Sequence, residues 1–470
     1  MKTTAAMTTE RVVAGLPRGV AVFYLLLFCT ALVIYGAAWR SSMATSADTP
    51  GYYAAAQDLA DLHIDQLQDR SPGYPLFLLL NGASDHPTKR LFFTSLLLHL
   101  TTIWLLAVTL YSAGLDGTWL KVFGILLLLP PYVQSAATVL TENLTQFCLV
   151  CGFSGLVRWR LSRRPIHLII ASVAIAYGGL TRPTYQVLAP IVALFLLSAG
   201  WYQAGLTKYH AIKASAALIL TSALMIGGFS AINYSRFGYF GITPLLGFNL
   251  STRTVLFWDR LPDEHRVVKE ILIKARDADL IEPGSSHTGY QSSHKARPEI
   301  IRVTGMTQAE TARYLVRMNL ELILLAPLNY LGEVGRVLGG SYWFPAANEL
   351  ANMNSRVVQM IWAAVHFIII GFFFLTFVIL CGTAAERIVR AVATGWPAPP
   401  FPPETHLQIF TYCLAGTMVF YTMIISCAVD TGTPRYRLPT DCLILLMTFL
   451  APLLWRRAAG DLAPENGLER

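Results

Sequence analysis

A small set of ionisable residues lies beside the long apolar segments of this chain, where charged side chains are costly and usually functional. Most of them are arginines, whose planar guanidinium groups bind phosphate oxygens in a bidentate manner. The two acids among them carry carboxylates that can accept a proton or orient a guanidinium. This mixture is typical of a site for an anionic substrate group. The set consists of Asp48, Arg70, Glu142, Arg182, Arg236, Arg435 and Arg437.

Asp48 begins the first polar segment of the chain, which ends at Pro75. It directly precedes Thr49 and Pro50, residue types that predict the start of a helix. The N–H groups and the dipole of a helix start favour an ionised carboxylate, which would suit a catalytic base. The alternative is that Asp48 only caps the helix. At the other end of the segment, Arg70 introduces the turn sequence Arg-Ser-Pro-Gly-Tyr-Pro.

The other members of the set have structural alternatives as well. Glu142 lies near the start of an apolar segment and is either a substrate ligand or a helix cap. Arg182, in the sequence Leu-Thr-Arg-Pro, either binds substrate or anchors the chain at a membrane interface. Arg435 and Arg437 flank Tyr436 before the last apolar segment, where arginines often extend toward the interface without binding a ligand.

The composition indicates a polytopic α-helical membrane protein. Of the 470 residues, 54% are hydrophobic and only 14% are charged, whereas soluble proteins carry about 25% charged residues. Several apolar runs approach the roughly 20 residues that a helix needs to cross a bilayer. The net charge of +8 requires no nucleic-acid partner, because Lys and Arg accumulate on cytoplasmic loops.

The apolar runs predict about ten transmembrane helices with both termini in the cytoplasm. Lys2, Arg11 and Arg18 precede the first run, and four arginines in 158–164 follow the predicted fourth span at 138–157. The positive-inside rule then assigns Asp48 and the loop around it to the outer side. Three regions are predicted: an N-terminal transmembrane core at 1–232 with a first outer catalytic loop at 39–75, an outer, periplasmic region at 233–356, and C-terminal transmembrane helices at 357–470.

The predicted outer region contains amphipathic surface helices. Thr307 and Glu310 form a capping-box signature. The helix that follows carries Leu315, Met318, Leu322 and Leu325 at helical spacing. We expect this helix and the amphipathic segment 328–344 to lie on or near the outer membrane surface.

No group of residues has the spacing of metal ligands. Cys148 and Cys151 form a Cys-x-x-Cys inside an apolar run, where core packing is expected. His265, His287 and His294 are spread along the outer region without ligand spacing. We therefore predict neither a metal nor a cofactor.

Six short motifs, in this order, make the chain resemble the GT-C superfamily of glycosyltransferases, which use polyprenyl-phosphate sugars. The resemblance is to the branch with protein O-mannosyltransferase-like and aminoarabinose-transferase-like bacterial proteins. The motifs are Asp48 with Tyr52, Arg70 to Pro75, Thr141-Glu142, Leu180 to Pro183, Gly247 to Leu250, and Arg435 to Pro439.

The resemblance implies a GT-C-like fold in which Asp48 is the catalytic base. Asp48 would deprotonate an acceptor hydroxyl as this attacks the anomeric carbon of the sugar with inversion. Arginines would stabilise the charge on the leaving polyprenyl phosphate, and the candidates are Arg182, Arg435 and Arg437. Arg70 and Glu142 would orient the substrate. Three tyrosines complete the implied substrate and lipid-phosphate site: Tyr52, Tyr74 and Tyr436.

The chain also departs from parts of the superfamily. Thr49 stands where many protein mannosyltransferases have an acidic residue, which disfavours protein mannosylation. No Trp-Trp-Asp sequence is present, which disfavours an oligosaccharyltransferase.

The resulting hypothesis is an inverting glycosyltransferase at the outer face of a bacterial inner membrane. Its partners would be membrane lipids, a polyprenyl-monophosphate sugar and a cell-envelope acceptor such as a glycolipid, a lipid A-like molecule or a polysaccharide. One alternative is a transporter or flippase of lipid-linked sugars, although transporters usually contain internal repeats and none is detected here. Another is an O-antigen polymerase or ligase with a diphosphate-linked donor.

Overall fold

The computed structural model describes residues 15–38, 43–63, 70–201, 206–281, 289–346, 355–394 and 403–460. Within these residues the chain is helical, and β-pairing is limited to one isolated bridge between Ala44 and Thr138. The predicted all-helical fold is confirmed at this level. Parts of the predicted first outer loop, 39–42 and 64–69, lie outside the described residues, as do Lys2 and Arg11.

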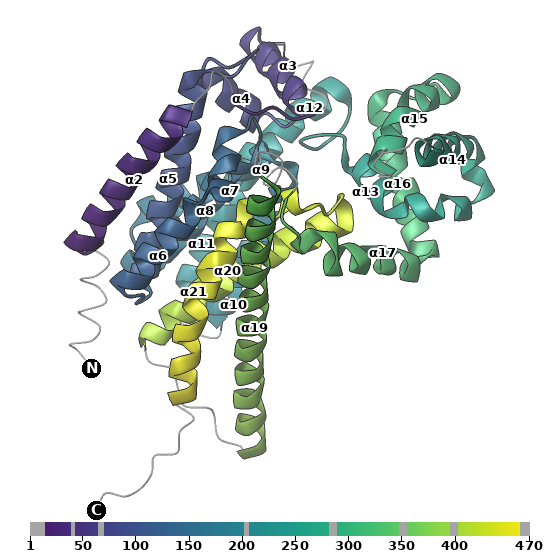
Figure 1. Ribbon diagram of the computed structural model, residues 1–470. Coiled ribbons are helices and arrows are strands. Elements are labelled where there is room, and N and C mark those ends of the chain that lie inside the picture. The colour runs from purple at the N-terminus through teal and green to yellow at the C-terminus, as the bar shows by residue number, and fades with distance from the viewer. Residues whose placement is uncertain are drawn as a thin grey trace, which may run out of the picture.

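The α-helices of the described residues fall into three groups along the chain (Figure 1). The first group is α2 (Arg18–Ala38), α3 (Thr49–Ala60), α4 (Gly73–Leu80), α5 (Lys89–Ser112), α6 (Gly117–Leu127), α7 (Pro130–Val133), α8 (Glu142–Ser162), α9 (Pro165–Thr181), α10 (Leu188–Trp201), α11 (Lys208–Ser222) and α12 (Gly228–Phe237). The second is α13 (Leu246–Thr254), α14 (Arg266–Ile281), α15 (Gly289–Thr304), α16 (Gln308–Leu325) and α17 (Pro327–Gly339). The third is α19 (Arg356–Thr394), α20 (Pro403–Val429) and α21 (Leu438–Gly460).

Several of these helices are long and apolar enough to cross a membrane, so the chain is a multi-pass membrane protein. Among the described residues there are seven, or up to nine if each of two bent helix pairs counts as one span. The seven are Arg18–Ala37, Lys89–Ser112, Pro183–Trp201, Lys208–Phe237, Arg356–Glu386, Thr405–Val429 and Leu438–Arg456. The predicted count of about ten is therefore not confirmed.

The difference from ten spans arises mainly at α8 and α9, the predicted fourth and fifth spans. α9 has only 17 residues. α8 carries many buried polar side chains, and one of them, Asn143, donates a hydrogen bond of 2.8 Å from Nδ2 to the Ser95 carbonyl. α8 packs against α5, α9 and α21. A helix enclosed by other helices can keep polar side chains if they are hydrogen-bonded, so α8 lacks the hydropathy of a lipid-facing span.

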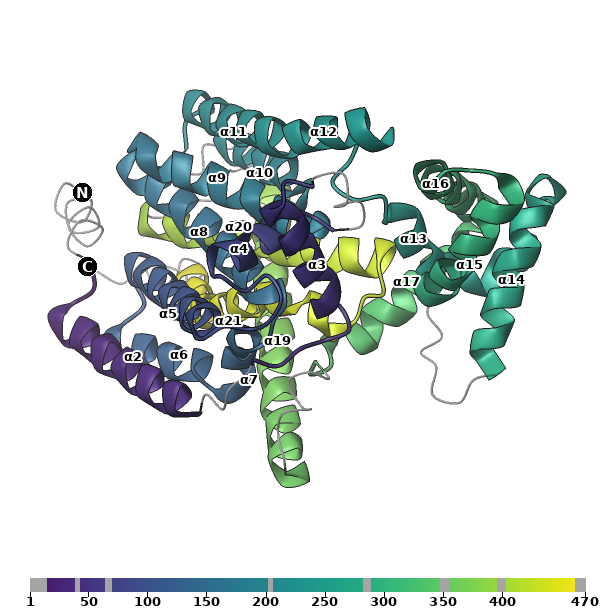
Figure 2. The ribbon, with the colours of Figure 1, turned by 90° about the horizontal axis from the view of Figure 1, so that it is seen from above.

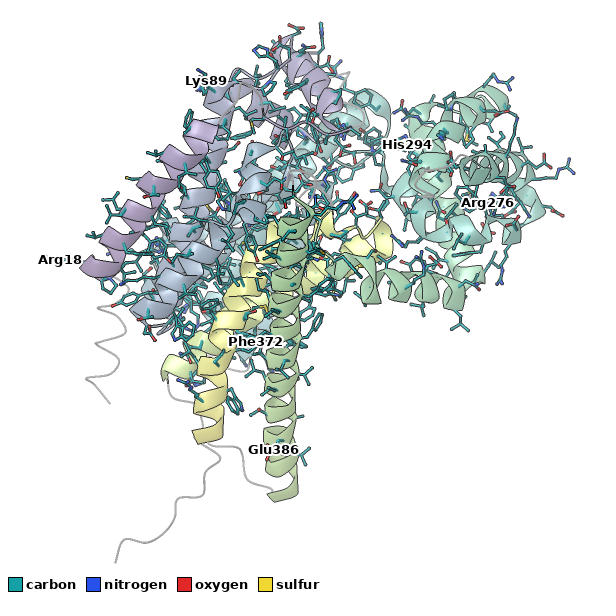
Figure 3. The ribbon with its side chains drawn as sticks, in the orientation of Figure 1. Arg18, Lys89, Arg276, His294, Phe372 and Glu386 are labelled. Atoms are coloured by element: carbon teal, nitrogen blue, oxygen red, sulfur yellow. The ribbon has the colours of Figure 1, made fainter. Side chains whose placement is uncertain are left out.

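The main hydrophobic core lies inside the bundle, and a second apolar surface faces outward. Tyr24, Phe123 and Phe153 are among the fully buried core side chains. In contrast, large apolar side chains on the outer faces of α2 and α19 are exposed. Phe372 is one of these and lies along α19, above Glu386 near its far end (Figure 3). Such faces are expected to contact lipid.

Two groups of helices are added to the bundle near the end where α19 begins. The short helices α3 and α4 lie over the bundle when it is seen from above (Figure 2). Helices α13 to α17 form an outer unit beside the bundle (Figures 1 and 2), with a separate core that includes Trp258 and Leu315. The predicted capping box is confirmed there: Glu310 N donates to Thr307 Oγ1, and Thr307 N donates to Glu310 Oε2.

Candidate active site

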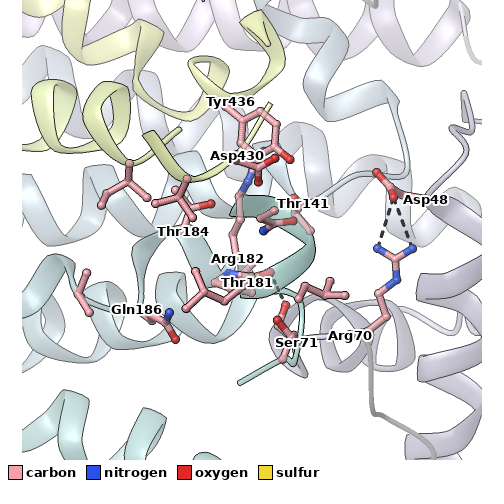
Figure 4. Close-up of a pocket in the computed structure, with 18 of the residues that line it drawn as sticks. Asp48, Arg70, Ser71, Thr141, Thr181, Arg182, Thr184, Gln186, Asp430 and Tyr436 are labelled. Atoms are coloured by element: carbon pink, nitrogen blue, oxygen red, sulfur yellow. Dashed lines mark hydrogen bonds and ion pairs between the residues drawn. The ribbon is translucent and has the colours of Figure 1, made fainter. Parts of the chain in front are cut away.

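A cavity of about 310 Å³ opens where the bundle, the short helix α3 and the outer unit meet. Its polar wall comes from the loop before α3, the turn before α4, the start of α8, the turn after α9 and the loop before α21. Figure 4 shows the side chains that converge on it. The cavity thus collects residues from segments that are far apart in the sequence. Among the predicted site residues, it is lined by Asp48, Tyr52, Arg70, Arg182, Arg435 and Tyr436.

Five charged side chains form a continuous chain of alternating sign along this wall. Arg70 Nη1 lies 3.4 Å from Asp48 Oδ1, and Arg435 Nη1 lies 2.7 Å from Asp48 Oδ2. Arg435 Nε also contacts Glu142 Oε1 at 2.5 Å. The same Glu142 oxygen lies 3.2 Å from Arg182 Nη1. We call this series, Arg70–Asp48–Arg435–Glu142–Arg182, the charge chain; its three cations exceed its two anions by one.

Glu142 is the buried centre of the charge chain, with a side chain that is only 1% exposed. It is the first residue of α8, where the exposed N–H groups of a helix start favour a negative charge. A buried carboxylate is stable only if it is paired, and Arg182 and Arg435 provide two partners. The sequence suggests that Glu142 is either a substrate ligand or a helix cap. The structure adds another role, because Glu142 holds two arginines in place.

Asp48 sits at the N-terminal boundary of α3, but its carboxylate accepts no capping hydrogen bond from the helix. Thr49 fixes the turn instead: its Oγ1 accepts from Ser46 N at 2.8 Å and donates to the Val139 carbonyl at 3.1 Å. The Asp48 carboxylate is thereby left to face Arg70 and Arg435. Burial raises the pKa of this carboxyl, but the two guanidinium charges outweigh the burial, so its pKa lies below the ordinary value.

The turn that carries Arg70 is docked on the turn that carries Arg182. Ser71 Oγ donates to the Thr181 carbonyl at 3.0 Å. A Cβ at Gly73 would lie 2.7 Å from the Thr181 nitrogen, and a Cβ at Gly51 would lie 2.7 Å from the Arg70 guanidinium. Gly73 therefore needs to be glycine because it meets backbone, which explains the Pro-Gly turn here, whereas a side chain at position 51 would displace the Arg70 guanidinium.

Aromatic rings support two of the arginines. The Arg70 guanidinium lies 4.7 Å from the centre of the Tyr52 ring, and that of Arg182 lies 4.4 Å from the Tyr436 ring. Such cation–π contacts hold a guanidinium without neutralising it. Tyr74 packs edge-on against Tyr52, with ring centres 5.0 Å apart, but it is buried and does not line the cavity.

The structure does not bring Arg437 to the cavity. Its side chain is fully buried, and its Nε donates to Asp441 Oδ1 at 2.7 Å. Its Nη1 donates to the carbonyls of Tyr342 and Phe344. Arg437 therefore ties the loop that carries Arg435 to the end of the outer region and does not face a ligand. Arg236, at the end of α12, is exposed and also lies away from the cavity.

Asp430 is a cavity residue that was not predicted from the sequence. Its side chain is buried, and Oδ1 accepts a hydrogen bond of 2.6 Å from Thr431 N. Burial raises the pKa of this carboxyl. Its carbonyl accepts two hydrogen bonds from Arg253, at 2.8 and 2.6 Å. In the sequence, the one indication that Asp430 belongs to the site was its position five residues before Arg435 in the same loop. Its burial could not be deduced from that position.

A possible metal-ligand group occurs in the outer unit and not in the cavity. His265 Nε2 lies 3.0 Å from Glu321 Oε2 and 3.4 Å from Glu264 Oε1. Among the described residues, these are three metal-ligating side chains whose ligand atoms lie within 4.8 Å of one another. No ligand spacing was recognised for His265 in the sequence, and His287 lies outside the described residues. His265 also contacts the Tyr314 hydroxyl at 2.5 Å, so the group is already internally bonded.

The arrangement can bind an anion and accept a proton in the same cavity. Three guanidinium groups approach one wall, and Asp48 is a half-buried, ionised carboxylate among them. Polar groups that could contact hydroxyls of a ligand, including Gln186 and Asn249, also line the cavity. Apolar side chains, among them Val187 and Ile425, complete the lining.

Comparisons of the chain with family models, with curated proteins and with solved structures gave no match.

Proposed function

We propose that this protein is an inverting glycosyltransferase of GT-C type. It transfers a sugar from a polyprenyl monophosphate to a cell-envelope acceptor at the periplasmic face of a bacterial inner membrane. The observation that carries the proposal is the charge chain beside a cavity with apolar lining, in a bundle of membrane-spanning helices.

The charge chain suits a phosphate bound to a long lipid. A phosphate placed at the cavity wall would meet the guanidiniums of Arg70, Arg182 and Arg435, which match its oxygens bidentately. The apolar lining at Val187 and Ile425 offers contacts for the first isoprene units of the lipid. The excess of one positive charge in the charge chain supports binding of an anion.

In the proposed reaction, the acceptor oxygen attacks the anomeric carbon from the face opposite the phosphate. The bond between that carbon and the phosphate oxygen breaks, and its electron pair leaves with the polyprenyl phosphate. Asp48 takes the proton of the acceptor hydroxyl. Arg435 and Arg182 stabilise the charge that develops on the leaving phosphate.

The ion pairs of Asp48 couple the basicity of its carboxylate to donor binding. Without a donor, Arg435 and Arg70 both hold its carboxylate and make it a weak base. A donor phosphate would compete for the same guanidinium groups, whereas Glu142 keeps Arg435 in position from its other side. Weaker pairing raises the pKa of Asp48 and makes it a better proton acceptor when the donor is present.

The decisive experiment compares donors with the purified protein in lipid nanodiscs. A polyprenyl-monophosphate sugar should be consumed with formation of a glycosylated acceptor, and the same sugar on a polyprenyl diphosphate should not. Activity only with the diphosphate donor would favour a polymerase or ligase. Movement of a lipid-linked sugar in a counterflow assay, without a covalent product, would favour a transporter or flippase.

A further inference from the structure

The outer unit exposes an apolar corner where α16 ends and α17 begins. Leu315 and Leu322 of α16 are buried in the core of this unit, but Leu324 and Leu328 are 80% and 81% exposed. Three more leucines close to them in sequence, at positions 320, 325 and 331, are also exposed. We call these five residues the leucine corner: Leu320, Leu324, Leu325, Leu328 and Leu331. An exposed apolar patch of this kind usually marks an interaction surface.

Part of the exposed face of α17 continues the leucine corner, and the same face carries Arg336, whose side chain is 66% exposed and paired with Glu333. Residues three or four positions apart share one side of a helix. Leu328 and Leu331 therefore share their side with Gly332, Gly335 and Gly339, and no atom lies within 4 Å of a Cβ built at any of these glycines. The strip formed by these leucines and glycines is thus smooth and apolar, and the charged Arg336 lies at its edge.

The opposite side of α17 is already in contact with the protein. Val337 is buried in a small core with Cys427 and Tyr342. The Tyr330 hydroxyl donates to the Ala428 carbonyl at 2.9 Å. Within the described part of the chain, α17 therefore packs through this opposite side and presents the leucines outward.

The orientation of α17 points to a membrane. α16 and α17 meet at 101°, and α17 runs across the direction of the spans (Figure 1). It lies at the height of the first turns of α19, where Val358 and Ile361 are exposed. These residues belong to a candidate membrane span. The leucine corner is therefore at the level where the lipid-facing surface of the bundle begins.

We infer that the leucine corner inserts into the outer leaflet of the bilayer. The partner is lipid hydrocarbon next to the headgroups, the region that amphipathic surface helices occupy. The sequence predicts only that these helices lie near the membrane; the structure adds which face enters it. The corner lies at the same height as the exposed first turns of α19 (Figure 1), which favours lipid over a second copy of the chain.

This insertion would also fix one wall of the cavity. α16 is joined to α13 through Asn319, whose Nδ2 donates to the Gly247 carbonyl at 2.9 Å and to Ser251 Oγ at 3.0 Å. The Thr254 hydroxyl donates to Asn319 Oδ1 at 2.5 Å. Because Leu246 and Asn249 of α13 line the cavity, the membrane holds this wall in place through the leucine corner.

A depth measurement tests the proposal. A fluorescent amino acid is introduced by codon suppression at Leu328, and in a matched variant at Val303, which is 47% exposed on α15 of the same unit. Each full-length protein is placed in nanodiscs with or without lipids that carry a nitroxide near the headgroup end of the acyl chain. The nitroxide lipids should quench the probe at Leu328 and leave the probe at Val303 unchanged.

Equal quenching at the two positions, or none at Leu328, would overturn the proposal. The fluorescence of the probe at Leu328 could instead be insensitive to nitroxide lipids and change with the number of protein copies per nanodisc. That result would assign the leucine corner to contact with a second copy of the chain. A second variant, Leu324→Asp with the probe at Leu331, should lose quenching to the level of the Val303 probe. It should also speed hydrogen exchange in α13 but not in α14; unchanged exchange in α13 would refute the coupling to the cavity wall.

Discussion

Replacement of Asp48 by asparagine separates the two tasks that the charge chain is proposed to perform. Asparagine keeps the size of the side chain but removes both the proton acceptor and the negative charge. Arg435 would keep its contact with Glu142, and Arg70 its contact with the Tyr52 ring. The arginines that are proposed to bind phosphate would thus remain close to their present positions while the base is lost.

The structure allows the size of each effect to be estimated. Loss of a general base costs about 10²- to 10⁴-fold in rate, so transfer should fall by that factor. The Asp48 side chain is 34% exposed, and its partners Arg70 and Arg435 are 29% and 26% exposed. Each ion pair of this kind contributes up to about 1 kcal/mol, and Asp48 makes two of them. Removal of that competition should therefore strengthen phosphate binding by up to about thirtyfold.

The assay measures transfer and binding on the same preparation. Product formation is followed by mass spectrometry, and the affinity for polyprenyl phosphate, the proposed leaving group, is followed by calorimetry in nanodiscs. The matched control is Asp61→Asn, which changes an exposed aspartate at the end of the same helix and should alter neither quantity.

Two results would refute this reasoning. Transfer by Asp48→Asn at nearly the normal rate would remove Asp48 from the base role. A loss of transfer that is matched by an equal loss of phosphate affinity would make Asp48 a binding residue, and the proposed competition for the arginines would be wrong.

Three further predictions concern the rest of the site. Glu142→Gln should lower the free energy of unfolding, measured by denaturant titration in mixed micelles, by about 3–5 kcal/mol, because Arg182 and Arg435 lose a buried carboxylate; a cost below about 1 kcal/mol would contradict this. The pKa of Asp48 lies below its ordinary 3.8, so its ion pairs stabilise the fold above that value and are lost as the pH falls through the lowered pKa. The acid limb of kcat/KM should therefore lie below pH 3.8, and that of kcat should lie at a higher pH because the donor weakens the pairs; identical acid limbs would contradict the competition. Arg437→Lys should lower both kcat and the affinity for polyprenyl phosphate, because Arg437 positions the loop that carries Arg435; normal values of both would contradict this positioning role.

Much of the fold follows from hydropathy, because a helix that faces lipid must be apolar along its length. This reasoning does not extend to helices enclosed by others. α8 carries Asn143 and Gln146 toward neighbouring helices and lacks the hydropathy of a span. The bent pair of α6 and the segment Pro130–Ala137, with 62° between its parts, occurs where Pro130 and Pro131 interrupt the helix.

Only part of the candidate site can be predicted from the sequence. The order of apolar runs assigns Asp48, Glu142 and Arg435 to one side of the membrane, and the structure brings them into contact. The pairing itself depends on side-chain packing and does not appear in the order of the residues. The position of Arg437 had a local signal that was not used: Asp441 follows four residues later, the spacing of an ion pair along one helix.

The charge chain also has a consequence for how the protein is made. Glu142 and Arg182 lie on neighbouring helices of one hairpin, so their ion pair can form early during synthesis. Arg435 comes 293 positions after Glu142, between the last two helices of the bundle. The charge chain is therefore completed only when α20 and α21 have entered the membrane. A nascent chain, or one that ends before α20, contains Asp48 without the arginine that connects it to the buried glutamate. Assembly of the functional cavity is thus tied to completion of the polypeptide.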